Sequence, residues 1–133
     1  MIDFPLDVVN KWSTRKGRAR KENLDTGGVY IGSSQIIAVL VDAAERGLKG
    51  AEYSKYWVNK ILVAVQKYDV ITYDLLITEM KSIHGDQYIA GFVLEMAAYA
   101  VLVIDNVNGS WAINCGDCRI GSLTEQDGMV WCG

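Results

Sequence analysis

Residues 35–54 read QIIAVLVDAAERGLKGAEYS, and we expect the rest of the chain to be arranged around them. Residues 36–41 are all apolar, rich in β-branched side chains and too few to cross a membrane, which predicts a buried strand. Asp42 follows at the end of this strand, before Gly47 and Gly50. A carboxylate in such a position either shapes the turn in contact with solvent or binds a hard cation. Both interpretations of Asp42 are open at this point.

Two helices are predicted after this strand. From Ala51 onward, apolar side chains recur at helical spacing, at Trp57, Ile61, Val65 and Tyr68. This pattern predicts a helix of about four to five turns. A second helix is predicted from Thr72 to His84, with Gly85 as the residue that follows its end. His84, the only histidine, is interpreted as a surface residue that complements the helix dipole rather than as a catalytic group.

The last third of the chain is predicted to be a β-meander. Apolar runs are separated by turn signals, and the predicted strands cover 99–104, 111–114, 120–123 and 129–131. Asn108-Gly109 predicts a two-residue hairpin turn, and Asp127-Gly128 predicts a second hairpin that leads into residues 129–131. Together with a short apolar segment at 29–31, this order predicts an α+β fold in which two helices cover an antiparallel β-sheet. We expect a single domain over residues 1–133.

Composition excludes several classes of protein. The 133 residues are 50% hydrophobic, enough for a core, and the net charge of −3 provides no field that would attract nucleic acid. No run of apolar residues is long enough to span a membrane, and the N-terminal residues carry no basic segment typical of a signal peptide. Three cysteines, an odd number, favour a reducing compartment. We therefore expect a cytoplasmic protein without a nucleic-acid or membrane partner.

A basic segment lies between residues 11 and 21. Six of these eleven residues are Lys or Arg. Such a run is typical of a solvated loop, but an arginine within it could also bind an anion through two parallel hydrogen bonds. Both interpretations are kept.

Three carboxylates are candidates for a metal site: Asp25, Asp42 and Asp117. Each is expected at a strand end or turn close to a glycine, and acids converging from separate strands suit Mg²⁺ or Mn²⁺ better than Zn²⁺. An adjacent arginine would suit a phosphate-bearing substrate, which a metal-bound water could attack. Cys115 and Cys118 form a C-x-x-C pair, which is interpreted as two small apolar residues rather than as a zinc or redox motif.

Four stretches resemble one family, the metal-dependent protein phosphatases of type 2C. The family's opening motif G-x-x-R-x-x-N-x-D resembles residues 17–25 (GRARKENLD), and its D-G-x-G-G-x-x-x-G-x-x-x-S turn resembles residues 42–54 (DAAERGLKGAEYS). Its M-G-T-T strand start resembles residues 96–99 (MAAY), and its N-x-G-D-S-R segment resembles residues 114–119 (NCGDCR). The four stretches occur in the family's order, with two helices between them.

The resemblance implies a site and an activity. Arg20 would bind the substrate phosphate, and Asp25 and Asp42 would bind two Mn²⁺ or Mg²⁺ ions directly or through water. The carbonyl of Ala43 stands at a ligand position, and Asp117 would serve a more peripheral third metal. The implied fold is a β-sandwich flanked by helices. The implied reaction is hydrolysis of phosphoserine and phosphothreonine by a metal-activated water.

Departures from the family pattern lower the expected activity. Ala43 replaces a glycine, and Glu45 and Arg46 replace two further glycines at positions where a positive φ would strain them. The family's later D-G and D-N ligands have no counterpart, so we expect the N-terminal half of such a domain. The alternative is a non-catalytic pseudophosphatase that binds a phosphoprotein or another protein. An open apolar sheet face would favour a homodimer or a higher homo-oligomer.

Overall fold

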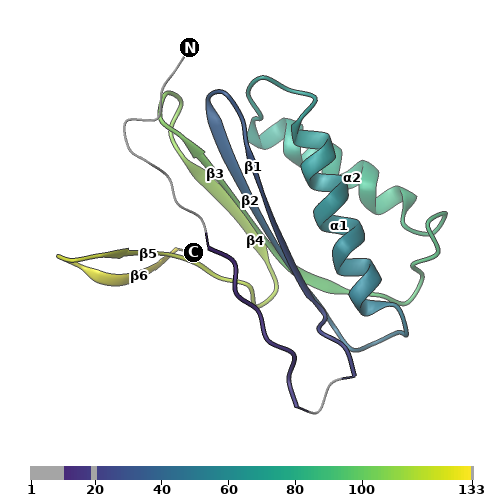
Figure 1. Ribbon diagram of the computed structural model, residues 1–133. Helices are drawn as coiled ribbons and strands as arrows, with labels where there is room; N and C mark the ends of the chain where they lie inside the picture. The colour runs from purple at the N-terminus through teal and green to yellow at the C-terminus, as the bar shows by residue number, and fades with distance from the viewer. Residues whose placement is uncertain (1–10, 19–20, 133) are drawn as a thin grey trace.

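The computed structural model describes residues 11–18 and 21–132. Its elements follow in the order β1 (Asp25–Ile31), β2 (Gln35–Ala43), α1 (Gly50–Val65), α2 (Tyr73–Asp86), β3 (Ala97–Asp105), β4 (Trp111–Cys115), β5 (Ile120–Thr124) and β6 (Gly128–Cys132). Strands β1 to β4 form one antiparallel sheet in chain order, and β5 and β6 form a separate hairpin (Figure 1). The α+β prediction with two covering helices is confirmed, whereas the last hairpin does not join the meander.

Strand β2 contains the predicted strand 36–41 and is one of the two inner strands of the sheet. It pairs with β1 on one side and with β3 on the other. Because side chains alternate between the faces of a strand, Ile37, Val39, Val41 and Ala43 lie on the face toward the helices and belong to the buried core. Leu40 and Asp42 lie on the opposite face, which we call the outer face.

Helix α1 packs directly over β1 and β2 (Figure 1). Its apolar stripe contributes Trp57, Ile61 and Val65 to the core. Close packing is possible because β1 presents Gly28 to the helix. A Cβ atom at this position would lie 2.7 Å from Leu62 Cδ1 and 3.0 Å from Val58 Cγ1. The absence of a side chain at residue 28 therefore sets the distance between helix and sheet.

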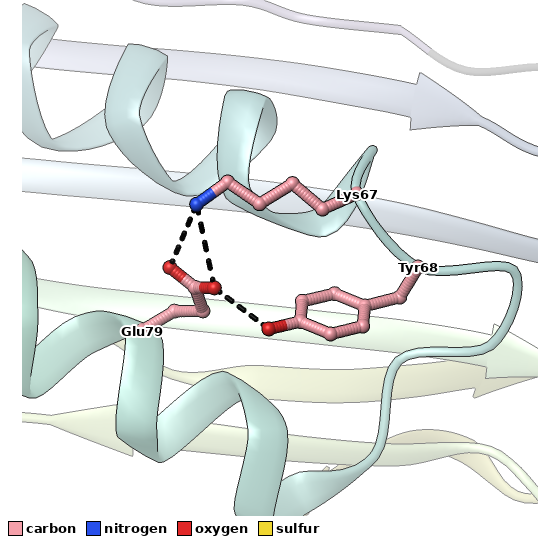
Figure 2. Close-up of polar contacts among 3 residues, drawn as sticks. All are labelled: Lys67, Tyr68 and Glu79. Atoms are coloured by element: carbon pink, nitrogen blue, oxygen red, sulfur yellow. Dashed lines mark hydrogen bonds and ion pairs between the residues drawn. The ribbon is translucent and has the colours of Figure 1, made fainter.

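Helix α2 begins where the sequence indicated and ends later. Thr72 is its N-cap and accepts a hydrogen bond from the Leu75 N–H at 3.3 Å. The prediction that Gly85 follows the end of the helix is wrong, because α2 includes Gly85 and the positive φ of 92° belongs to Gly91. The connection from α1 is held by Glu79, which accepts a hydrogen bond from Tyr68 at 2.8 Å and forms an ion pair with Lys67 (Figure 2).

The turn between β3 and β4 differs from the predicted two-residue hairpin. A two-residue turn at Asn108-Gly109 requires a positive φ at both residues. Only Gly109 has one, at 91°, and residues 106–110 form the connection. Asp105 accounts for the longer loop, because its Oδ1 accepts hydrogen bonds from the N–H groups of Val107 and Asn108, each at 2.9 Å.

The outer face of the four-stranded sheet is only partly covered. Val29, Ile31, Ala38, Leu40 and Leu102 lie along a groove of about 620 Å³, bordered by Trp12 and by residues 119–121. Ile31 is 59% exposed. Both helices lie on the other side of the sheet (Figure 1). In the described part of the chain, no helix has the length and apolar character needed to cross a membrane.

Candidate functional site

Asp25 and Asp42 face each other across two neighbouring strands. The β1–β2 register places them directly opposite, at the end of β2 that leads to α1. Their neighbours Thr26 and Val41 face the helices, so both carboxylates lie on the outer face. Directly opposite residues have Cβ atoms about 4.5–5.5 Å apart, and like charges at that distance destabilise a sheet unless they are neutralised. The fold therefore brings together two of the three candidate acids.

Asn23 positions the first of these acids. Its Oδ1 accepts a hydrogen bond from the Asp25 N–H at 3.1 Å, and its Nδ2 donates to Thr14 Oγ1 at 2.8 Å. Thr14 in turn donates weakly to Asp25 Oδ2 at 3.5 Å. Side chain and backbone of Asp25 are thus held by one short network. Thr14 was not among the residues singled out from the sequence, because only the fold brings it to Asp25.

A buried hydroxyl pair supports the site from the helix side. Ser54 is 0% exposed, and its Oγ lies 2.9 Å from Thr26 Oγ1. Ser54 is on α1, and Thr26 is the β1 residue next to Asp25. This contact ties the helix to the strand at the position of the acidic pair. Ser54 lies in the 42–54 stretch, but the sequence did not indicate its partner.

The turn after Asp42 forms without the strain expected from its composition. Ala43 is buried, and its N–H donates to the Leu24 carbonyl at 3.1 Å. Glu45 and Arg46 occupy the positions of two family glycines, yet no described residue other than glycine has a positive φ. The Arg46 N–H bonds the Ala44 carbonyl at 2.9 Å. The expectation that a positive φ would strain Glu45 and Arg46 is therefore wrong, because neither residue has a positive φ.

Cys118, the residue that follows Asp117 in the chain, lies within electrostatic reach of the acidic pair. Cys118 is buried, and burial together with the charges of Asp42, Asp117 and Asp25 raises the pKa of its thiol to about 11. One thiol is therefore within electrostatic reach of all three candidate acids. Asp117 itself is exposed in the turn after β4. Cys115 and Cys118 are free thiols.

The remaining predicted site residue lies outside the described residues. This residue is Arg20, and its relation to the acids stays a prediction. The neighbouring residues 11–18 of the basic segment are exposed. This agrees with a solvated loop.

The acidic pair borders a shallow depression of about 220 Å³. Glu22, Asn23, Leu24, Asp25, Asp42 and Ala43 line it. Among residues 11–18 and 21–132, no three His, Cys, Asp or Glu side chains are grouped so that they could hold a metal ion. Mg²⁺ is often bound by one or two carboxylates and several waters. The residues present therefore fit one hydrated divalent cation and do not fit a dinuclear centre.

Comparison with known proteins identifies the fold. No protein-family profile and no curated protein sequence matches this chain. Among solved structures, the chain is similar to the crystal structure of an arginine-to-glutamate variant of a bacterial serine phosphatase, with a TM-score of 0.69 and 18% sequence identity. The similarity covers 86% of this chain and 56% of that one. This chain has a phosphatase-like α+β fold and spans little more than half the length of the phosphatase it resembles.

Proposed function

We propose that this chain is a phosphatase-like domain whose hydrolysis of phosphoserine and phosphothreonine is weak or absent. The observation that carries the proposal is that Asp25 lies opposite Asp42 at the end of β2 that leads to α1. Among the described residues, no third His, Cys, Asp or Glu side chain joins them in a group that could hold a metal ion. Two carboxylates can hold one hydrated cation. A reaction that needs two metal ions would lack ligands for the second.

The chain's own residues have distinct roles in this proposal. Asp25 and Asp42 would hold Mn²⁺ or Mg²⁺, with the Ala43 carbonyl beside them and Asp117 at the periphery. Arg20 would bind the phosphate. When bound, the cation would lower the pKa of a coordinated water enough to supply a nucleophile near neutral pH.

A non-catalytic function is the second candidate. It is favoured by the same shortage of ligands and by the apolar outer face, where Trp12 and Ile31 are 51% and 59% exposed. Exposed apolar surface of this kind is typical of protein-binding sites. In this alternative the chain binds a phosphoprotein or another protein without turnover, and its binding does not depend on a cation.

Calorimetric titration of Mn²⁺ and an assay with p-nitrophenyl phosphate distinguish these functions. Wild type should bind Mn²⁺ weakly and hydrolyse little or no substrate. Asp42→Asn should lose the binding, whereas Asp127→Asn, which removes an exposed acid from the β5–β6 turn, should retain it. Equal Mn²⁺ binding by all three proteins would contradict the site. Robust Mn²⁺-dependent turnover that disappears in Asp42→Asn would contradict weak or absent activity.

Phosphate binding tests the role of Arg20. Titration of inorganic phosphate into wild type and Arg20→Ala should show weaker binding by the variant. Arg15→Ala, a change in the same basic segment, is the matched control. Equal weakening by the two substitutions would indicate a general effect of charge rather than a specific contact.

A further inference from the structure

A second hollow lies on the helix side of the sheet, away from the acidic pair. Its volume is about 700 Å³, within the range of small-molecule sites. Helix α1 packs on the sheet while α2 packs mainly against α1, which leaves space between α2 and the strands. The cavity is lined by Tyr53, Trp57, Met80, Glu95 and Tyr99, among other residues, and by the exposed side chains of Lys81 and His84.

The walls are aromatic and held in place. The Tyr53 and Trp57 rings meet edge to face, with centroids 6.4 Å apart and planes at 80°. The Tyr53 hydroxyl donates to Gln87 Oε1 at 3.1 Å. Tyr99 enters from β3, and Met80 enters from α2. Rigid aromatic walls favour a flat, apolar ligand body.

Glu95 gives this cavity a specific chemistry. It is 7% exposed, and its Oε1 accepts a hydrogen bond from the Lys49 N–H at 3.0 Å, at the start of α1. Its Oε2 is buried and has no hydrogen-bond partner among the described residues. A buried carboxylate oxygen without a donor is costly, so a donor brought by a ligand would be stabilising.

Two further observations concern the placement of the Glu95 carboxylate beside the cavity. Burial, and to a smaller extent the charge of Glu95, raises the pKa of Tyr53, so the carboxylate acts on a side chain of the same wall. Gly47 explains how the carboxylate is accommodated, because a Cβ atom at this residue would collide with Glu95.

We propose that the cavity between α2 and the sheet binds a small aromatic amine, whose ring lies among Tyr53, Trp57 and Tyr99 and whose ammonium donates to Glu95 Oε2. This site is separate from the acidic pair, because Asp42 lies on the outer face whereas its neighbour Val41 lines the cavity. It goes beyond the proposed function and does not depend on it.

Two indole ligands of opposite charge provide the test. Tryptamine carries an ammonium, and indole-3-propionate carries a carboxylate on the same ring. We expect tryptamine to bind at least about ten-fold more tightly, because a hydrogen bond to a charged group is worth that much. In nuclear magnetic resonance spectra, the Trp57 indole and the Glu95 amide should shift, whereas Gly27 and Leu40 on the outer face should not.

Substitution of Glu95 tests the contact itself. Glu95→Gln preserves an oxygen for the Lys49 N–H and removes the charge, so tryptamine binding should fall at least about ten-fold. Glu52→Gln, an exposed change in the first turn of α1, should leave binding unchanged. Equal binding of both ligands, shifts confined to the outer face, or unchanged affinity in a folded Glu95→Gln protein would each overturn the proposal. If Glu95→Gln does not fold, the ligand pair and the shift map on wild type decide.

Discussion

Asp105 shows how much a single buried carboxylate can organise. It is 3% exposed and accepts hydrogen bonds from two loop N–H groups, from Asn108 Nδ2 at 3.1 Å and from Gln35 Nε2 at 2.9 Å. Burial acts to raise its pKa, but these hydrogen bonds favour the ionised form and lower the pKa to about 2. Gln35 extends the network to the segment before α2, through the Ile71 carbonyl at 3.0 Å and the Ile71 N–H at 2.7 Å.

The lowered pKa makes stability depend on acid. Because the folded-state pKa lies below the unfolded value of about 3.9, ionised Asp105 stabilises the fold above about pH 4. This contribution is lost as the pH falls toward 2. Urea unfolding of wild type should therefore show decreasing stability across this window, and Asp105→Asn should show a flatter dependence. A wild-type profile identical to that of Asp105→Asn would contradict the role of this carboxylate.

At neutral pH the same substitution should also reduce stability. An asparagine amide would turn a donor toward the donors of Gln35 or Asn108, and the expected loss is about 1–3 kcal/mol. The matched control is Asp127→Asn, an exposed change in a hairpin turn, for which we expect a change within about 0.5 kcal/mol. A loss as large in Asp127→Asn as in Asp105→Asn would show that the hydrogen-bond network is not the cause.

Two glycines, one in a strand and one in a helix, have opposite effects on the stability of their elements. Gly28 lies on β1 beneath α1, where a Cβ atom would meet Leu62 and Val58. Gly85 lies inside α2, is exposed, and has nothing within 4 Å of the position of a Cβ atom. The first glycine permits the packing of a helix on a sheet, whereas the second only weakens its helix.

Substitution at these two positions should change stability in opposite directions. Gly28→Val should lower the free energy of unfolding by about 1–3 kcal/mol, because the branched side chain displaces α1 from the sheet. Gly85→Ala should raise it by about 0.5–1 kcal/mol, because alanine restricts the unfolded chain and favours the helix. Urea unfolding with a constant slope measures both changes. A neutral Gly28→Val would mean that α1 is not closely packed on β1.

For the whole molecule, the outer face of the sheet raises the question of assembly. Helices cover one face, and the groove on the other is lined by apolar side chains of β1, β2 and β3. Burial of apolar surface is worth about 25 cal/mol per Å², so covering this face would favour association. We therefore propose that two copies of the chain form a homo-oligomer by packing outer face to outer face.

Size-exclusion chromatography with light scattering tests this assembly. Wild type should elute as a dimer or larger, and Ile31→Lys on the outer face should shift it toward a monomer of 14.7 kDa. Val63→Lys is the control, because Val63 is equally exposed, at 60% against 59% for Ile31, but lies on α1. A wild-type monomer at high micromolar concentration, or equal effects of both substitutions, would contradict packing through the outer face.

The sequence by itself determined the elements and their order. The apolar runs at 36–41 and 99–104 indicated buried strands, and the helical spacing from Trp57 to Val65 indicated α1, because these patterns depend only on which faces of a local element are buried. The predicted helical spacing continued to Tyr68, which lies beyond the last residue of α1. Asp25, Asp42 and Asp117 could be selected because acids next to strand ends and glycines form a recognisable local pattern.

Tertiary structure alone decided which residues meet. The placement of Asp25 opposite Asp42 follows from the strand register, and the contacts of Ser54 with Thr26 and of Gln35 with Asp105 join residues far apart in the chain. The end of α2 and the loop after Asp105 were predicted incorrectly for the same reason. Gly85 does not end α2, which continues to Asp86. Asn108-Gly109 does not form a two-residue turn, because hydrogen bonds to Asp105 hold a longer loop. Local propensities amount to about 1 kcal/mol, so packing and buried hydrogen bonds, which act only after the chain has folded, can reverse them.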